Sequence, residues 1–211
     1  MKHDRIKHDL IKHAEEREAI ESFIQLDKSC SLQQFPLTLQ LDTDDSIPDA
    51  IVMNKKDGLL HWLEVVTISR TAQEREEVGK FRNGEIWQDD ELLSGEIFDL
   101  QLFEDETYQQ ICNAIYKKNQ KNYTKFSELY RTKIRGTLIV RLINFRPFLD
   151  TGMISKICDK FNKNVLLSLH CDKPVFDRIV LIADLLIDHR YTPYESTIAD
   201  EGIMQRLQEH N

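Results

Sequence analysis

Apolar and polar residues alternate along the chain with two different periods, which indicate where helices and strands form. A repeat of three to four residues predicts a helix, whereas a repeat of two, or a short run rich in Val and Ile, predicts a strand. The expected helices are 5–26, 71–81, 105–123, 153–161 and 198–209. The expected strands are 37–41, 50–53, 59–68, 136–144 and 179–187, and 165–169 fits either a short strand or a continued helix.

The order of these elements predicts an α/β fold in which a mixed sheet is flanked by helices. A chain of 211 residues with 41% hydrophobic content can bury one sizeable core, and no low-complexity tract divides it. We therefore expect a single domain over 1–211. Its core is expected at about 5–144, with an acidic insertion at about 83–104 and a C-terminal extension over 150–211.

Two carboxylates flank a turn that joins the second and third expected strands. Asp49 precedes the turn Asn54–Gly58 and Glu64 follows it. A four-residue loop places Asp49 directly opposite Glu64, about 5 Å away, whereas a two-residue turn places it on the diagonal, roughly 7–8 Å away. A three-residue loop would separate the two acids across the sheet.

The surroundings of Glu64 favour a paired or metal-bound carboxylate. Glu64 interrupts the apolar run 62–68, where a buried carboxylate is costly unless it is paired or binds a metal. The alternative is that Glu64 faces solvent on an edge strand. If the two acids share a face, a divalent cation can sit between their tips.

Pro48-Asp49 on the second strand and Glu64-Val65-Val66 on the third resemble the motif of the PD-(D/E)XK nuclease-like superfamily. The resemblance implies a restriction-endonuclease-like αβββαβ core. It also implies that Asp49 and Glu64 are catalytic and bind Mg²⁺ or Mn²⁺ for phosphodiester hydrolysis of DNA or RNA. Val66 stands where the motif has a lysine, so the resemblance implies a divergent member with a degenerate or migrated active site.

Some members of the superfamily carry that lysine on another element. The segment 111–123 looks like the Ile-x3-Ile-x2-Lys…Tyr helix of several nuclease-like families. Lys118 shares the helical stripe of Ile111 and Ile115, and Lys121 lies one turn further. The resemblance therefore implies that Lys118 or Lys121 replaces the missing catalytic lysine. Alternatively, both lysines simply favour the C-terminal end of the helix dipole.

The resemblance also implies a third metal ligand, because some members add a glutamate from the opening helix. Four residues are available, Glu15, Glu16, Glu18 and Glu21. We choose Glu18 for its position in the middle of the expected helix.

Charge is distributed unevenly along the chain, whose net charge is −8. Residues 89–106 hold eight acids and no Lys or Arg, whereas 117–146 hold nine Lys or Arg and one acid. The second segment predicts a basic face that could bind nucleic acid, the alternative being a solvated helix followed by a basic loop. No membrane partner is expected, since every apolar run is too short to span a bilayer. The charged N-terminus and scattered cysteines predict a cytoplasmic location.

Two classes of function thus remain open from the sequence. The first is a metal-dependent nuclease. The second is the same fold without catalysis, acting as an interaction or structural module, for example as a homodimer. The position of the Lys118 amine discriminates them, because an amine far from both carboxylates favours the second. A third alternative is an unrelated α/β fold in which Asp49 and Glu64 never meet.

Overall fold

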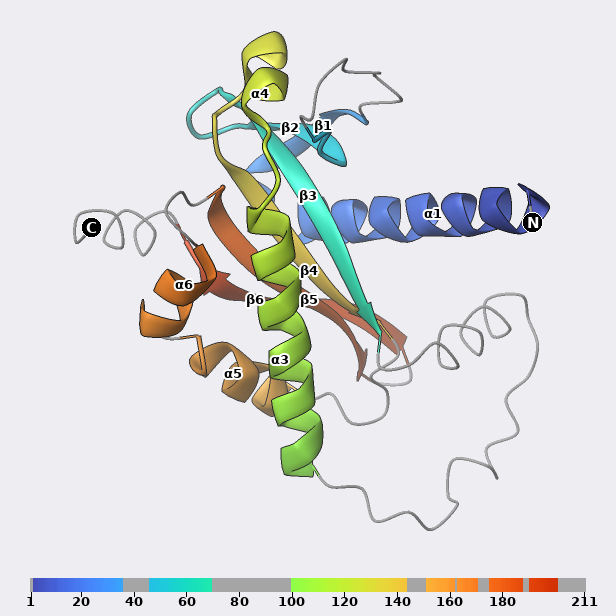
Figure 1. Cartoon of the computed structure of the whole chain (residues 1–211), viewed down its shortest axis with the longest axis vertical. Coiled ribbons are helices and arrows are strands. Elements are labelled where there is room, and N and C mark those ends of the chain that lie inside the picture. Colours follow the sequence, from blue (N-terminus) through green and yellow to red (C-terminus); the bar gives the residue numbers. More distant parts are fainter. Residues whose placement is uncertain are drawn as a thin grey trace.

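In the computed structural model, the described residues form one mixed sheet with helices on both faces (Figure 1). These residues are 2–35, 46–69, 100–143, 151–161, 163–170, 175–187 and 190–200. The helices are α1 (Lys2–Leu26), α3 (Leu100–Asn119), α4 (Thr124–Tyr130), α5 (Thr151–Asp159) and α6 (Lys163–His170). The strands are β1 (Cys30–Gln34), β2 (Ala50–Asn54), β3 (Leu60–Ser69), β4 (Gly136–Ile143), β5 (Phe176–Ile187) and β6 (Arg190–Ala199). The expected mixed α/β class is confirmed.

The strands lie in the sheet in the order of the sequence, from β1 to β6. β1, β2 and β3 form an antiparallel meander, and β5 and β6 form an antiparallel pair at the other edge. The central pairs β3–β4 and β4–β5 are parallel. Because parallel neighbours need a crossover, helices α3 and α4 lie between β3 and β4 in the chain, and α5 and α6 lie between β4 and β5. The expected C-terminal extension thus continues the same sheet.

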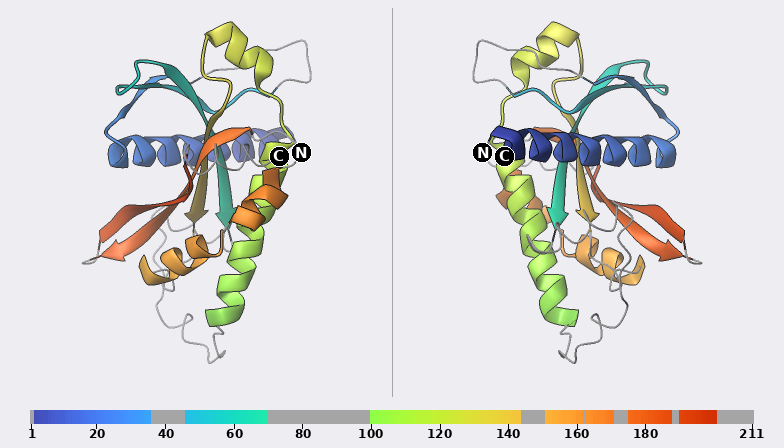
Figure 2. Two further views of the ribbon diagram at one scale, coloured as in Figure 1. Left: turned by 90° about the vertical axis from the view of Figure 1, so that its left-hand side faces the viewer. Right: turned by 90° about the vertical axis from the view of Figure 1, so that its right-hand side faces the viewer.

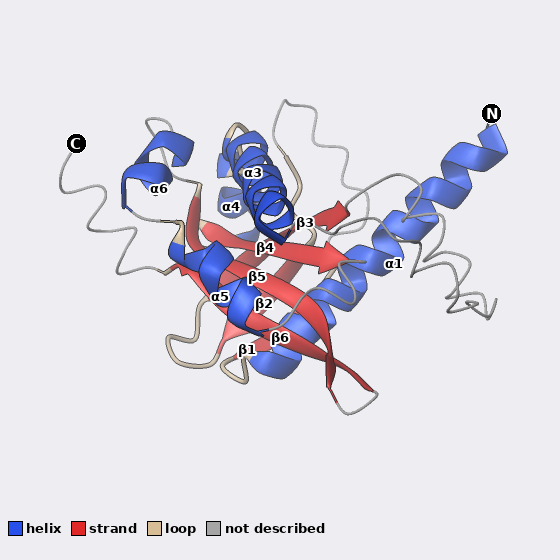
Figure 3. Cartoon of the chain, turned by 90° about the horizontal axis from the view of Figure 1, so that it is seen from below, coloured by secondary structure: helices blue, strands red, loops and turns tan. Residues whose placement is uncertain are grey.

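Each face of the sheet has its own core (Figures 2 and 3). On one face, α1 runs across the strands and buries Ala19, Ile20 and Phe23 against the sheet. On the other face, α3, α5 and α6 cover a larger cluster that includes Trp62, Ile111, Ile115, Leu138, Val140, Ile154, Ile157 and Leu181. None of the helices within the described ranges is long and apolar enough to cross a membrane.

The hairpin between β2 and β3 has the register of the four-residue loop. Ala50 pairs with Leu63, and Met53 pairs with Leu60. Gly58 has φ +68, a left-handed conformation that glycine adopts without strain. The paired ladder ends at Ala50 with Leu63, and the backbone N–H of Asp49 also donates to the Leu63 carbonyl, so the ladder becomes irregular at Asp49.

Several element boundaries differ from the expectations. β1 at Cys30–Gln34 was missed, and the strand expected at 37–41 lies outside the described residues, as does the helix expected at 71–81. β1 is short and, toward its end, exposed, so its apolar signal is weak. The irregular segment expected at 83–104 was wrong at its end, because helix α3 already begins at Leu100.

The helix expected at 105–123 ends at Asn119, and the separate helix α4 follows it. The ambiguous segment 165–169 belongs to a helix, α6. The terminal helix expected at 198–209 was wrong at its start, because residues 198–199 end β6, and 201–211 lie outside the described residues. Pro193 lies within β6, and a proline in a sequence argues against a strand. It is tolerated here because β6 is an edge strand of the described sheet.

Candidate functional site

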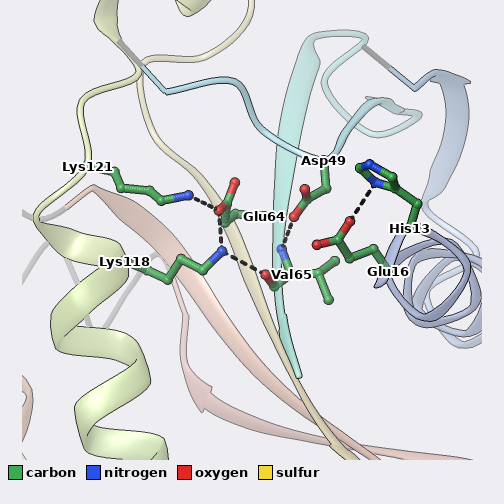
Figure 4. A network of polar contacts seen from close by, with 7 residues as sticks. All are labelled: His13, Glu16, Asp49, Glu64, Val65, Lys118 and Lys121. Atoms are coloured by element: carbon green, nitrogen blue, oxygen red, sulfur yellow. Dashed lines mark hydrogen bonds and ion pairs between the residues drawn. The ribbon is translucent and has the colours of Figure 1, made fainter. Parts of the chain in front are cut away.

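The candidate site forms where β2 begins and β3 continues beside β4 (Figure 4). The Asp49 backbone N–H donates to the Leu63 carbonyl at 2.9 Å. The Asp49 carboxylate oxygen Oδ2 accepts the backbone N–H of Val65 at 2.7 Å. The side chain of Asp49 therefore replaces a backbone acceptor at the end of the ladder, which fixes the carboxylate beside the third strand.

Glu64 is the buried centre of the site, with 1% of its surface exposed. It shares a strand face with Trp62 and Ile68, both in the core beneath α3. Glu64 Oε1 accepts hydrogen bonds from the Lys118 amine and, at 2.7 Å, from the Lys121 amine. Glu64 Oε2 is buried and has no hydrogen-bond partner among the described residues. The ion pairs therefore satisfy one oxygen of this carboxylate and leave the other unpartnered.

Helix α3 carries Lys118 to the sheet because its inward stripe is apolar. Ile111 and Ile115 are fully buried, and Lys118 follows Ile115 on the same side near the end of the helix. Its amine also donates to the Val65 carbonyl at 2.9 Å. Lys121 follows the helix, where its backbone N–H donates to the Lys118 carbonyl at 3.1 Å. Both predicted lysines thus meet Glu64, as Figure 4 shows.

The surroundings of Asp49 favour the protonated form of its carboxyl group. Burial, followed by the charges of Glu64 and Glu16, raises the pKa of Asp49 from 3.8 to about 7. The Lys118 amine and the Val65 N–H lower the pKa but do not compensate. A carboxylate in this state gains from any added positive charge, because a cation would offset both the burial and the repulsion.

Lys121 and Tyr123 complete the wall of the site beside Glu64. Burial alone would lower the pKa of Lys121. The charge of Glu64 and its hydrogen bond to Lys121 outweigh this effect, so the pKa of Lys121 is raised. The Tyr123 ring stacks on Trp62 with centroids 4.2 Å apart. Its hydroxyl is buried and lies next to the Glu64 side chain. Burial and then the neighbouring Glu64 charge raise the pKa of Tyr123, so the hydroxyl stays protonated and able to donate.

Glu18, the predicted third metal ligand, pairs with Arg141. Its two carboxylate oxygens contact the guanidinium of Arg141 at 3.0 and 3.1 Å. Arg141 is buried on β4 and also donates to the Glu15 carbonyl at 3.0 Å. Glu18 thus neutralises a buried arginine beneath α1, and nothing in this pairing brings it to Asp49 or Glu64.

Glu16, rather than the expected Glu18, is the acid of α1 that faces the site. Its carboxylate points from α1 toward Asp49 in Figure 4, and its charge contributes to the raised pKa of Asp49. His13 Nδ1 lies 3.1 Å from Glu16 Oε2. The sequence carries a signal for this placement, since Glu16 is spaced three, four and seven residues before the buried Ala19, Ile20 and Phe23. An acid on the buried stripe of a helix is the one that reaches the sheet.

The oxygen donors of the site suit a hard divalent cation. They are the carboxylates of Asp49 and Glu64 and the Val65 carbonyl, which accepts a hydrogen bond from the Lys118 amine. Within the described ranges, no group of three or more His, Cys, Asp or Glu side chains is arranged to hold a metal ion. Mg²⁺ is nevertheless commonly bound by one or two carboxylates together with water and substrate phosphate. Of the two Glu64 carboxylate oxygens, Oε2 is the one that the lysines do not engage, and it is buried.

No protein-family model, curated protein or solved structure matches the chain.

Proposed function

We propose that the chain is a nuclease-like protein of the PD-(D/E)XK type that hydrolyses phosphodiester bonds of DNA or RNA with Mg²⁺ or Mn²⁺. The observation that carries this proposal is the placement of the Lys118 amine. It donates both to Glu64 and to the carbonyl of Val65, the residue directly before the valine that stands in the lysine position of the motif. Helix α3 thus supplies the amine that strand β3 lacks.

The arrangement of the elements gives independent support. A long helix, an antiparallel meander, a second helix and a parallel strand follow one another as α1, β1–β3, α3 and β4. This is the order that the restriction-endonuclease-like core requires. Asp49 and Glu64 lie at the meander, Lys118 lies on the following helix and Lys121 comes directly after it, so consecutive elements meet at one point.

The side chains divide the chemistry of hydrolysis between them. Asp49 and Glu64 would hold the cation, which supplies a polarised phosphoryl oxygen and an activated water. The Lys118 amine donates to Glu64 and positions its carboxylate. Lys121 is more exposed than Lys118, at 38% against 18%, so its amine is the better placed to reach a phosphate oxygen as negative charge develops. The Tyr123 hydroxyl is a further donor in the same wall.

The test measures cleavage of plasmid, single-stranded DNA and RNA with Mg²⁺ and with Mn²⁺. Wild type is compared with Asp49→Ala/Glu64→Ala, and with Lys156→Ala as a control that removes an exposed lysine on α5. We expect cleavage by wild type and by the control, and none by the double variant. Cleavage that persists in the double variant, or that needs no added metal, contradicts the proposal.

Binding of the cation is measured separately by thermal unfolding with and without Mn²⁺. We expect Mn²⁺ to stabilise wild type by about 2.7 kcal/mol at a hundredfold excess over its dissociation constant. Asp49→Asn/Glu64→Gln should lose this stabilisation. If Mn²⁺ stabilises both proteins equally, it binds elsewhere and the assignment of the ligands is wrong.

A second candidate function is the inactive interaction module, and two observations favour it. The two lysines already neutralise Glu64 Oε1, so the cluster is balanced at that oxygen as an ordinary buried ion pair. In addition, Leu59 and Ile134 are exposed, at 50% and 75%, on segments joined by the Lys133 N–H bond to the Leu60 carbonyl. If wild type neither cleaves nor binds Mn²⁺, this surface becomes the place to test for a homodimer. Leu59→Ser/Ile134→Ser should then convert a dimer to a monomer in sedimentation equilibrium.

A further inference from the structure

A groove of about 370 Å³ runs between strand β3 and helix α3 and begins at the candidate site. Lys118 and Val66 line it at that end, and Gln110 lines it about two turns of helix away, a distance of about 12 Å. Pockets for small ligands occupy about 300–1,000 Å³, so this groove fits one compact group. It is too small to receive a double helix.

The charge of the groove is opposite to that of the chain as a whole. Among its described lining residues are Lys117 and Lys118, and no Asp or Glu. The chain, by contrast, has a net charge of −8. The acids at the other end of α3, Glu104 and Asp105, are held by Lys160 at 2.7 and 2.6 Å. The groove therefore suits an anionic ligand whose charged part lies at the Lys118 end.

The floor of the groove is apolar. Val66, Ile68 and Ala114 contribute it, and they belong to or pack against the core beneath α3. A lysine at position 66 would place a long cationic chain where this floor now lies. The same residue that removes the lysine of the motif therefore leaves an apolar surface against which a flat ring can rest.

Two amide side chains stand over this floor on α3. Gln110 and Asn113 are three residues apart and so lie on one side of the helix, with Asn113 exposed. Amide side chains present a donor and an acceptor together, which matches the edge of a nucleobase. An apolar floor beneath paired donors and acceptors is how enzymes hold a base that has left its stack.

We propose that this groove binds the base of an unpaired nucleotide next to the scissile phosphate, and that the substrate is therefore a single strand or a locally unpaired one. The inference rests on the proposed function, because it places the phosphate of that nucleotide at Lys118. Gln110 and Asn113 contact the base edge, and Val66 and Ile68 contact its face. A paired base in a duplex cannot enter the groove without leaving its partner.

The experiment compares short single-stranded DNA with the duplex of the same sequence, in fluorescence-anisotropy binding with Ca²⁺ and in cleavage with Mn²⁺. We expect the single strand to bind and to be cleaved at least about tenfold better than the duplex. Gln110→Ala/Asn113→Ala should weaken binding of the single strand by about tenfold and leave duplex binding unchanged. Gln109→Ala, an exposed amide outside the groove, is the matched control and should bind as wild type does.

Both amides lie on the surface side of α3, so the double variant is expected to fold, which circular dichroism checks. Cleavage of single strand and duplex at equal rates, or single-strand binding that the double variant leaves unchanged, overturns the inference while the proposed function stands. Absence of cleavage and of nucleic-acid binding by wild type overturns both.

Discussion

The Lys118 amine and the carbonyl oxygen of Val65 lie 2.9 Å apart, so helix α3 anchors its lysine to the backbone of strand β3 itself. The next residue on that strand is Val66, which is partly buried against the core beneath α3. A long side chain starting at position 66 and one arriving from position 118 therefore approach the same carboxylate. An amine beside Glu64 can therefore come from position 66 or from position 118.

The first prediction exchanges these two positions. Lys118→Ala should lower Mn²⁺-dependent cleavage by about a hundredfold or more, since it removes a charge from the reacting centre. Adding Val66→Lys to that variant should recover at least about tenfold, because a lysine stem can lie along apolar surface and place its amine at Glu64. Initial cleavage rates check both. A double variant that folds and is no faster than Lys118→Ala would show that the amine at this place has no role in the reaction.

The second prediction concerns pH. Because burial, Glu64 and Glu16 raise the pKa of Asp49 to about 7, the folded protein keeps a proton that the unfolded chain releases near its ordinary pKa of 3.8. The stabilisation from the protonated form is complete below about pH 4 and is lost as the pH rises through about 7. It amounts to about 4 kcal/mol at most.

Urea unfolding at several pH values between about 4 and 8 measures this dependence. Asp49→Asn, which can still accept the Val65 N–H through its amide oxygen, should flatten the profile. Asp159→Asn, an exposed change on α5, should not. A wild-type profile parallel to that of Asp49→Asn would mean that Asp49 keeps an ordinary pKa.

The third prediction separates two glutamates of α1. Glu18→Gln weakens a charged pair with the buried Arg141 and should lower the free energy of unfolding by about 1–3 kcal/mol, with Mn²⁺ binding unchanged. Glu16→Gln removes a negative charge near Asp49 and should instead weaken Mn²⁺ binding. Isothermal titration calorimetry and urea unfolding on both variants provide the comparison. The reverse pattern would restore Glu18 as the acid of the opening helix.

The fourth prediction concerns the packing behind the site. A Cβ added to Gly136 would lie 2.3 to 2.6 Å from the Trp62 ring, which is fully buried and stacked on Tyr123. Gly136→Ala should therefore lower the free energy of unfolding by about 1–3 kcal/mol, because neither ring can move without displacing its neighbours. Thermal unfolding followed by tryptophan fluorescence measures it. Gly58→Ala tests a different cost at a place with open space, since φ is +68 there and the strain is local. Unchanged stability of Gly136→Ala would mean that the Trp62 pocket is loosely packed.

Much of the fold could be predicted because local patterns determine it. The turn with a glycine predicted the β2–β3 hairpin, with the four-residue loop as one of its possible registers, and the stripe of α3 placed Lys118 inward with Ile111 and Ile115. The strands β1 and β6 were missed for an equally local reason. Both are edge strands of the described sheet, and edge strands carry polar residues, short lengths or, in β6, Pro193, all of which weaken the period of two.

The choice of the first-helix acid shows where position along an element is insufficient. Glu18 was chosen because it lies mid-helix, but orientation decides which acid meets the sheet. Glu16 shares the stripe of Ile20 and Phe23, whereas Glu18 is about half exposed and reaches sideways to Arg141. The pairing of Arg141 with Glu18 could not be predicted from the sequence, because α1 and β4 come into contact only in the folded protein.

Separation along the chain gives the site an order of assembly. The hairpin brings Asp49 and Glu64 together over one short turn, whereas Lys118 bonds to Glu64 across 54 residues. Closing the longer loop costs more chain entropy and is slower. An early hairpin would thus set two like charges side by side with no amine between them, and it should hold together only at low pH or after α3 has docked. Lys118 and Lys121 would therefore stabilise the two carboxylates only after α3 has docked and β4 has paired with β3.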